Sequence, residues 1–85
     1  MIESEVKYTW VSCGDRHTAA LSASGHVYTC GHGEHGQLGH GTNSDELRLK
    51  LVSDIANLTI KRVQCGSILT AVIDRNDLIG SWIFF

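Results

Sequence analysis

The sequence predicts an all-β fold, in which short antiparallel strands form about one and a half blades of a β-propeller. No window shows apolar residues at helical spacing over three turns, whereas short runs rich in β-branched residues recur along the chain. Proline is absent and the glycines are concentrated between Gly14 and Gly41, as in closely spaced strands joined by tight turns. An internal repeat of about 50 residues completes the prediction, because propeller blades recur at this period.

Six runs read as strands, and each is bounded by glycine or polar turn residues. The expected strands are 11–13, 18–21, 26–30, 47–52, 60–65 and 69–73. In residues 46–52 leucines alternate with Arg48 and Lys50, which predicts a strand with one face in water. Residues 53–58 predict a turn or one short helical turn. The apolar C-terminal segment 78–85 predicts the start of one more strand.

The repeat consists of two segments that align without gaps. VSCGDRHTAALSASGHVYTCG begins at Val11, and VQCGSILTAVIDRNDLIGSWI begins at Val63. The identical pairs are Val11 and Val63, Cys13 and Cys65, Gly14 and Gly66, Thr18 and Thr70, and Ala19 and Ala71. We expect one partial propeller domain over 1–85, with a first repeat at about 11–62 and a truncated second repeat at about 63–85. A single blade cannot cover its own faces, so each needs neighbours.

The first repeat resembles the regulator-of-chromosome-condensation (RCC) repeat family. That family combines V-x-C/A-G-x-x-H-T-x-A-L, G-x-V-Y-x-W/F-G and G-Q-L-G-x-G. The matching structural positions are Cys13, Gly14, His17, Gly25, Gly31, Gly36, Gln37, Leu38, Gly39 and Gly41. The resemblance covers residues 11 to about 73 and implies a seven-bladed β-propeller. Cys30 departs from it, since an aromatic residue usually precedes that glycine, and Leu69 replaces the second repeat's histidine. Trp82 falls where the gapless alignment places the family's aromatic residue.

The resemblance also implies a function. Family roles include nucleotide exchange on a Ran-type small GTPase, chromatin association, and propellers attached to ubiquitin ligases or other scaffolds. We therefore expect a non-enzymatic protein-interaction module, a fragment or short isoform of a guanine-nucleotide exchange factor or scaffold protein. Its partner would be a small GTPase of the Ran type or a scaffold component. Candidate partner-binding residues are the charged turn positions Asp15, Arg16, Glu34 and His35. No catalytic, cofactor-binding or metal residue is assigned.

The glycine-rich segment TCGHGEHGQLGHGTN, residues 29–43, has three interpretations. Its G-x-G-x-x-G spacing fits dinucleotide binding, but the mechanism needs a helix start, and the residues that follow would not form a helix. Ligand-type residues would make the chain a small metal-binding protein, the alternative function, although their spacing matches no common zinc motif. These residues are Cys30, His32, His35 and His40.

The third interpretation, a strand-to-strand turn, accounts for more residues. Glycines at 36 and 39 permit positive φ values that other residues avoid. Leu38 is expected to anchor the turn, and Gln37 to bond main-chain groups that the turn leaves unpaired. The three histidines of the segment are then solvated turn residues. A catalytic Cys13–His17 pair lacks a base-and-orienter constellation. We expect Cys13 to be buried in an inner strand, and the resemblance makes His17 a structural histidine near the central channel that fixes a backbone turn.

Charge and composition limit the remaining classes. The net charge is −2 with no block of like charge, which argues against direct nucleic-acid binding. The start of the chain, MIESEVKYTW, lacks the basic and apolar regions of a signal peptide, and no apolar run approaches the roughly 18 residues of a membrane span. We expect no membrane partner, and an intracellular location in the cytoplasm or nucleus, with the three cysteines as thiols.

Overall fold

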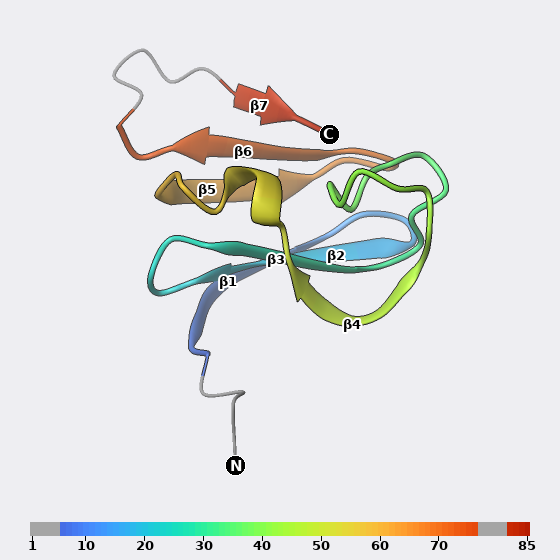
Figure 1. Cartoon of the computed structure of the whole chain (residues 1–85), viewed down its shortest axis with the longest axis horizontal. Helices are drawn as coiled ribbons and strands as arrows, with labels where there is room; N and C mark the ends of the chain where they lie inside the picture. The colour runs from blue at the N-terminus through green and yellow to red at the C-terminus, as the bar shows by residue number, and fades with distance from the viewer. Residues whose placement is uncertain (1–5, 77–81) are drawn as a thin grey trace.

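Two antiparallel β-sheets pack face to face in the computed structural model, which describes residues 6–76 and 82–85 (Figure 1). The first sheet has the strand order β1-β2-β3-β4, and the second has β5-β6-β7. Neighbouring strands follow one another in sequence, so each sheet is a meander. The strands are β1 Tyr8–Cys13, β2 His17–Ser22, β3 Val27–Gly31, β4 Glu46–Leu51, β5 Ile60–Cys65, β6 Thr70–Asp74 and β7 Trp82–Phe84.

All six strands expected from the sequence are present, which confirms the all-β prediction. Strand β1 begins at Tyr8 instead of Val11, and a register shift between Tyr8 and Trp10 interrupts its pairing with β2. A register shift breaks the regular alternation by which a strand is recognised. The short 3₁₀ helix η1, Ser53–Ile55, lies in the segment expected to turn. Strand β7 confirms the predicted C-terminal strand, while residues 78–81 of that segment lie outside the described residues.

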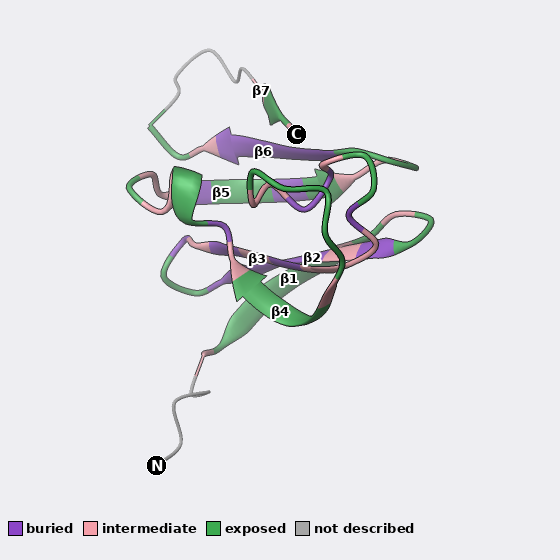
Figure 2. Ribbon diagram, turned by 45° about the vertical axis from the view of Figure 1, so that its right-hand side comes forward, coloured by how far each residue is buried: buried purple, intermediate pink, exposed green. Residues whose placement is uncertain are grey.

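The hydrophobic core lies between the two sheets. Ala19 and Leu21 alternate along β2 and contribute to it, and Val63 of β5 pairs in register with Val72 of β6. Strands β1 and β2 lie against β5, which joins the sheets along their first strands. Figure 2 shows β6 buried and β4 exposed, so burial is concentrated where the sheets face each other. The core cluster comprises Ala19, Leu21, Val27, Val52, Ile60, Val63 and Val72.

The opposite side of the first sheet is open, which contradicts two expectations. Cys13 was expected to be buried but is exposed, because β1 is an edge strand and its outward positions have no covering layer in the described chain. Strand β4 was expected to have one wet face, yet its leucines are exposed as well: Leu47 is 97% exposed and Leu49 37%. The apolar side of the first sheet therefore remains accessible.

The register of β7 corrects the gapless repeat alignment. In the first sheet Leu21 pairs with Val27, and in the second Ile73 pairs with Trp82. Leu21 and Ile73 are equivalent at the repeat offset, so Val27 corresponds to Trp82 and not to position 79. The connection before β7 is longer than the corresponding turn before β3, and the alignment slips there by three residues.

The same correction identifies the aromatic residue of the second repeat. Thr70 exchanges both main-chain hydrogen bonds with Phe85, at 2.7 and 2.8 Å. Thr18, its counterpart in the first repeat, pairs with Cys30. Phe85 therefore occupies the aromatic position, and the assignment of Trp82 to it was wrong.

Three polar contacts join the two sheets near the loops that connect their first two strands. Each spans 52 or 53 residues, so the contacts recur at the repeat offset. The contacts are Cys65 N donating to Ser12 Oγ at 2.9 Å, His17 Nε2 donating to Thr70 Oγ1 at 3.0 Å, and Ser67 Oγ donating to Asp15 Oδ2 at 2.7 Å. The repeat thus sets the geometry of the interface as well as that of each sheet.

Candidate functional site

Three strand connections meet at one end of the molecule: the β1–β2, β3–β4 and β5–β6 loops. The first two are joined by a hydrogen bond of 2.7 Å from His32 N to the Arg16 carbonyl. This close approach requires glycine at position 31, which has φ 108°, and whose added Cβ would lie 2.6 Å from Arg16 O. Asp15 N donates to Ser67 O at 3.2 Å and holds the third loop beside the first.

A cleft of ≈ 130 Å³, here called the loop-end cleft, lies between these loops. All four residues that the sequence nominated for partner contact line it, although they come from two loops separated along the chain. Ser67 and Ile68 add the third loop, and Ile68 is 52% exposed. The lining residues are Asp15, Arg16, His32, Glu34, His35, Gln37, Ser67 and Ile68. Sequence reasoning missed Ser67 and Ile68, since no local motif marks a loop that belongs to the next repeat.

One histidine of the cleft lies between two carboxylates. His32 Nε2 lies 2.7 Å from Glu34 Oε1, and His32 Nδ1 lies 3.3 Å from Asp45 Oδ1. The hydrogen bond to Glu34 and the two nearby negative charges raise the pKa of His32, and the same hydrogen bond lowers the pKa of Glu34. The cleft therefore presents the protonatable His32–Glu34 pair beside the guanidinium of Arg16 on the neighbouring loop.

The glycine-rich segment forms the expected strand-to-strand turn. Gly36 and Gly39 have φ values of 74° and 77°, in the left-handed region predicted for them. Gln37 Oε1 accepts a hydrogen bond of 2.8 Å from His35 N, which is the expected bond to an unpaired main-chain group. Leu38 is 1% exposed and anchors the turn as predicted.

Two threonines from different sheets donate hydrogen bonds to main-chain carbonyls of this turn. Thr29 Oγ1 donates to Leu38 O at 2.6 Å, and Thr70 Oγ1 donates to Gln37 O at 2.7 Å. Each hydroxyl has then used its proton, so it accepts from a histidine Nε2: His40 at 2.9 Å for Thr29, and His17 at 3.0 Å for Thr70. The turn is thus tied to both repeats through matched Thr–His pairs.

His17 is a buried connector between the repeats and is 3% exposed. Its Nε2–H also lies 3.1 Å from Leu69 O, whereas its Nδ1 is buried without a hydrogen-bond partner. Protonation at Nδ1 would bury an unpaired N–H and a charge, and burial accordingly lowers the pKa of His17. The resemblance predicted a structural histidine that fixes a backbone turn, and the side chain of His17 reaches across to Leu69 O in the β5–β6 turn of the second sheet.

The candidate metal ligands of residues 30–40 lie apart or are bonded to other groups. Within the described residues, which include 30–40, no three Cys, His, Asp or Glu side chains are arranged to hold a metal ion. Both ring nitrogens of His32 face carboxylates, and His40 Nε2 is bonded to Thr29. Burial raises the pKa of the Cys30 thiol, which opposes the thiolate form. The expectation of three solvated histidines holds for His35 alone, since His32 and His40 are half-buried.

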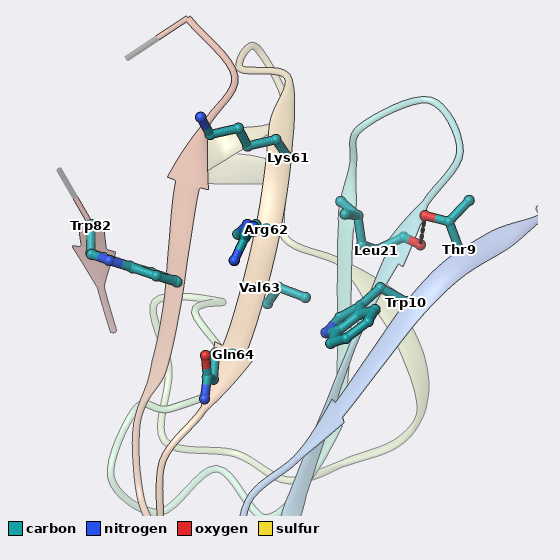
Figure 3. A pocket seen from close by; sticks show the side chains of 8 residues that line it. All are labelled: Thr9, Trp10, Leu21, Lys61, Arg62, Val63, Gln64 and Trp82. Carbon is teal, nitrogen blue, oxygen red and sulfur yellow. Dashed lines mark hydrogen bonds between the residues drawn. The ribbon is translucent and has the colours of Figure 1, made fainter. Parts of the chain in front are cut away.

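A larger cavity, with a volume of ≈ 350 Å³, lies elsewhere, along β5 (Figure 3). In Figure 3 the indole of Trp10 points from β1 toward Val63 of β5. Its charged lining residues are Lys61 and Arg62, so the groove carries positive charge only. None of the residues nominated from the sequence lines it. Residues 6–76 and 82–85 contain no helix with the length and apolar character needed to cross a bilayer.

A family model described as Regulator of chromosome condensation (RCC1) repeat matches residues 24–73, more than half of the chain. Among curated proteins, the human E3 ubiquitin-protein ligase HERC2 is 40% identical over 74 residues. That alignment covers 85% of this chain and 2% of the ligase. The Arabidopsis thaliana ultraviolet-B receptor UVR8 is 36% identical over 73 residues, which is 85% of this chain and 17% of the receptor. The chain therefore spans a small part of each relative.

Solved structures with the same fold also match this chain over a small part of their length. Human WBSCR16 superposes with a TM-score of 0.78 at 26% identity, and the match covers 89% of this chain and 19% of that one. Prp20p from Saccharomyces cerevisiae, described with its binding to Gsp1p and histones, superposes with a TM-score of 0.75 at 19% identity. That match covers 89% of this chain and 20% of Prp20p, and it shows a shared fold.

Proposed function

The chain belongs to the RCC1 repeat family, and we propose that it is a non-enzymatic protein-interaction module whose partner-binding surface is the loop-end cleft. In this proposal the chain is a fragment or short isoform of a guanine-nucleotide exchange factor or scaffold protein. It acts inside the cell, in the cytoplasm or nucleus. The partner is a small GTPase of the Ran type or a component of a scaffold.

One observation carries the proposal: the four charged residues nominated from separate turns line a single cleft. Arg16, Glu34 and His35 are all exposed, so their charges are available to a partner. Loops at one end of a rigid sheet assembly are common places for binding residues, because the scaffold fixes their positions. The hydrogen bonds among the three loops supply that rigidity here.

The cleft suits a polar protein surface better than a small apolar ligand. Its volume of ≈ 130 Å³ is below the roughly 300 Å³ at which small-molecule pockets begin. Its lining combines a guanidinium, carboxylates and histidines with the exposed side chain of Ile68. Charges around an apolar contact are typical of the polar rim and buried centre of a protein–protein interface. Prp20p, which shares this fold, was described with binding to Gsp1p and histones, which supports a protein partner.

Binding of the intact chain to a purified Ran-type GTPase tests the proposal. Arg16→Glu should weaken binding at least about tenfold, because reversing a charge at an interface places like charges together. Arg48→Glu is the matched control: it makes the same charge change on exposed strand β4, away from the cleft. Equal weakening by both variants would show general electrostatics and remove the cleft from the proposal. Failure of the unsubstituted chain to bind would remove the GTPase.

A further inference from the structure

The outer face of the second sheet is open and hollowed. We define this second outer face by Gln64, Leu69, Ala71, Trp82 and Phe84, which surround a hollow of ≈ 240 Å³ together with Gly66. The β6–β7 register places Ala71 opposite Phe84, on the side away from the core residue Val72. Phe84 is 63% exposed, so the face offers a large apolar side chain to a neighbour. A small sheet with an uncovered apolar face is incomplete without another layer.

The outer face of the first sheet carries counterparts of the residues that the second sheet presents to the internal interface. We define this first outer face by Val11, Cys13, Thr18, Ala20 and Tyr28. Their counterparts at the repeat offset are on the side of the second sheet that packs against the first. Three of them are identical: Val63, Cys65 and Thr70 match Val11, Cys13 and Thr18. The first outer face therefore resembles the face of the second sheet that packs against the first sheet within this chain.

Thr18 shows what the first outer face lacks. Its counterpart Thr70 accepts from His17 and donates to Gln37 O. Among the described residues, the Thr18 hydroxyl makes only a weak contact of 3.7 Å, to Cys13 Sγ. Within the described part of the chain, the partners that Thr70 receives from the preceding sheet have no equivalent in front of Thr18.

From this match we infer that the second outer face of one copy of this chain binds the first outer face of another copy, head to tail. The contact repeats the one between the two sheets within each chain. The equivalent of the contact between Cys65 and Ser12 is a contact between Cys13 and Gln64 of the neighbouring copy. The equivalent of the contact between Thr70 and His17 is a contact between Thr18 and Leu69 of that copy. The third contact, between Asp15 and Ser67, would recur between Ser67 of one copy and Asp15 of the next, two residues that also line the cleft. The inference rests on the repeat match and not on the proposed function.

A head-to-tail contact has a definite consequence for assembly. It uses two different surfaces, so each copy can bind two others, and the assembly closes into a ring when the rotation allows. Propellers close with about four to eight blades, and each copy supplies two sheets. The inference therefore predicts closed assemblies of about two to four copies.

Complementation between two variants tests the inference by sedimentation velocity. Val11→Glu places a charge on the first outer face and Phe84→Glu on the second, at side chains that are 56% and 63% exposed, so the fold of the monomer should persist. Each variant alone should be monomeric at concentrations where the unsubstituted chain assembles. An equimolar mixture should give one-to-one heterodimers, because one intact face of each kind remains.

Other outcomes overturn the inference. A monomeric unsubstituted chain contradicts it, and so does a Phe84→Glu variant that still dimerises through its first outer face. Full assembly of Val11→Glu would point to pairing at the β7 edge instead. Leu69→His provides a second test that does not depend on loss of binding: it supplies the donor that Thr18 lacks. This variant should tighten association about fivefold, whereas Leu69→Phe, which has no donor, should not.

Discussion

The hydroxyl of Thr70 donates a hydrogen bond of 2.7 Å to the main-chain carbonyl of Gln37, and so fastens the second sheet to the glycine turn of the first repeat. Both partners are buried, with Thr70 0% and Gln37 2% exposed. Because the same hydroxyl accepts from His17, one side chain joins the turn, the first sheet and the second sheet.

Thr70→Val should destabilise the chain by about 1–3 kcal/mol, because it removes the donor to the buried Gln37 carbonyl and one of the two acceptors of the His17 N–H. Thr18→Val is the matched control, since it makes the same change at the equivalent position, where the hydroxyl has a weak contact of 3.7 Å to Cys13 Sγ. Its effect should stay within about 0.5 kcal/mol. Urea unfolding at a concentration where both variants are monomeric measures the difference. Equal losses would refute the role assigned to Thr70.

Gly39→Ala should destabilise the fold more than Gly41→Ala. The two glycines have nearly equal φ values of 77° and 76°, so the backbone strain of about 1 kcal/mol or more is common to both. An added Cβ at position 39 would meet the Phe85 ring at 2.5 Å, while at position 41 it meets nothing within 4 Å. Thermal unfolding of the two variants separates strain from steric overlap. If they unfold at the same temperature, Phe85 does not pack on the turn as described.

Stability should fall as the pH drops below the ordinary histidine value near 6.5. Burial lowers the pKa of His17 in the folded chain, so the unfolded chain takes up a proton first. The stability from neutral His17 is fully present above about 6.5 and is lost as the pH falls toward the folded-state pKa. His17→Gln should be less stable at neutral pH and should lose part of this acid sensitivity. Unfolding midpoints from pH 5 to 8 test this, and an unchanged acid slope in the variant would assign the effect to another group, His40 foremost.

The imidazole of His32 should titrate above the ordinary histidine value, because Glu34 accepts its hydrogen bond. The pair is held together below the ordinary pKa and separates as the pH rises through the folded-state pKa of His32. Glu34→Gln should lower that pKa, with little effect on stability since both side chains are partly in water. NMR titration of the His32 ring protons, in the unsubstituted chain and in the variant, gives the value directly. A pKa unaffected by Glu34→Gln would exclude this pair.

Most of the fold could be predicted from the sequence, because the strands and the turn depend on local residue patterns. Alternation and β-branched residues marked the strands, and the spacing of glycines marked the turn at 36 and 39. These signals arise from residues close together in the sequence, so they can be recognised without knowing the tertiary contacts. The charged turn residues Asp15, Arg16, Glu34 and His35 were nominated in the same way, and they line one cleft. Their role in binding a partner is a proposal.

What the sequence did not reveal depends on contacts between distant residues. The exposure of Cys13 follows from what covers β1, not from its own propensity to be buried. The slip of three residues before β7 leaves no trace in composition, because a longer connection changes the register without changing the strand. The Thr29–His40 and Thr70–His17 pairs arise only when the turn is folded against both repeats.

The separation of the contacts between the two sheets has a consequence for the order of folding. Within each sheet the strands are hairpins of near neighbours, whereas Ser12–Cys65 and Asp15–Ser67 join residues 53 and 52 positions apart. Closing so long a loop costs entropy before the contacts repay it, so the hairpins form first and the sheets dock late. A change at a docking contact should then act mainly on the rate of unfolding and leave the rate of folding nearly unaltered. The interface between the repeats would in this way govern how long the folded chain persists once it has formed.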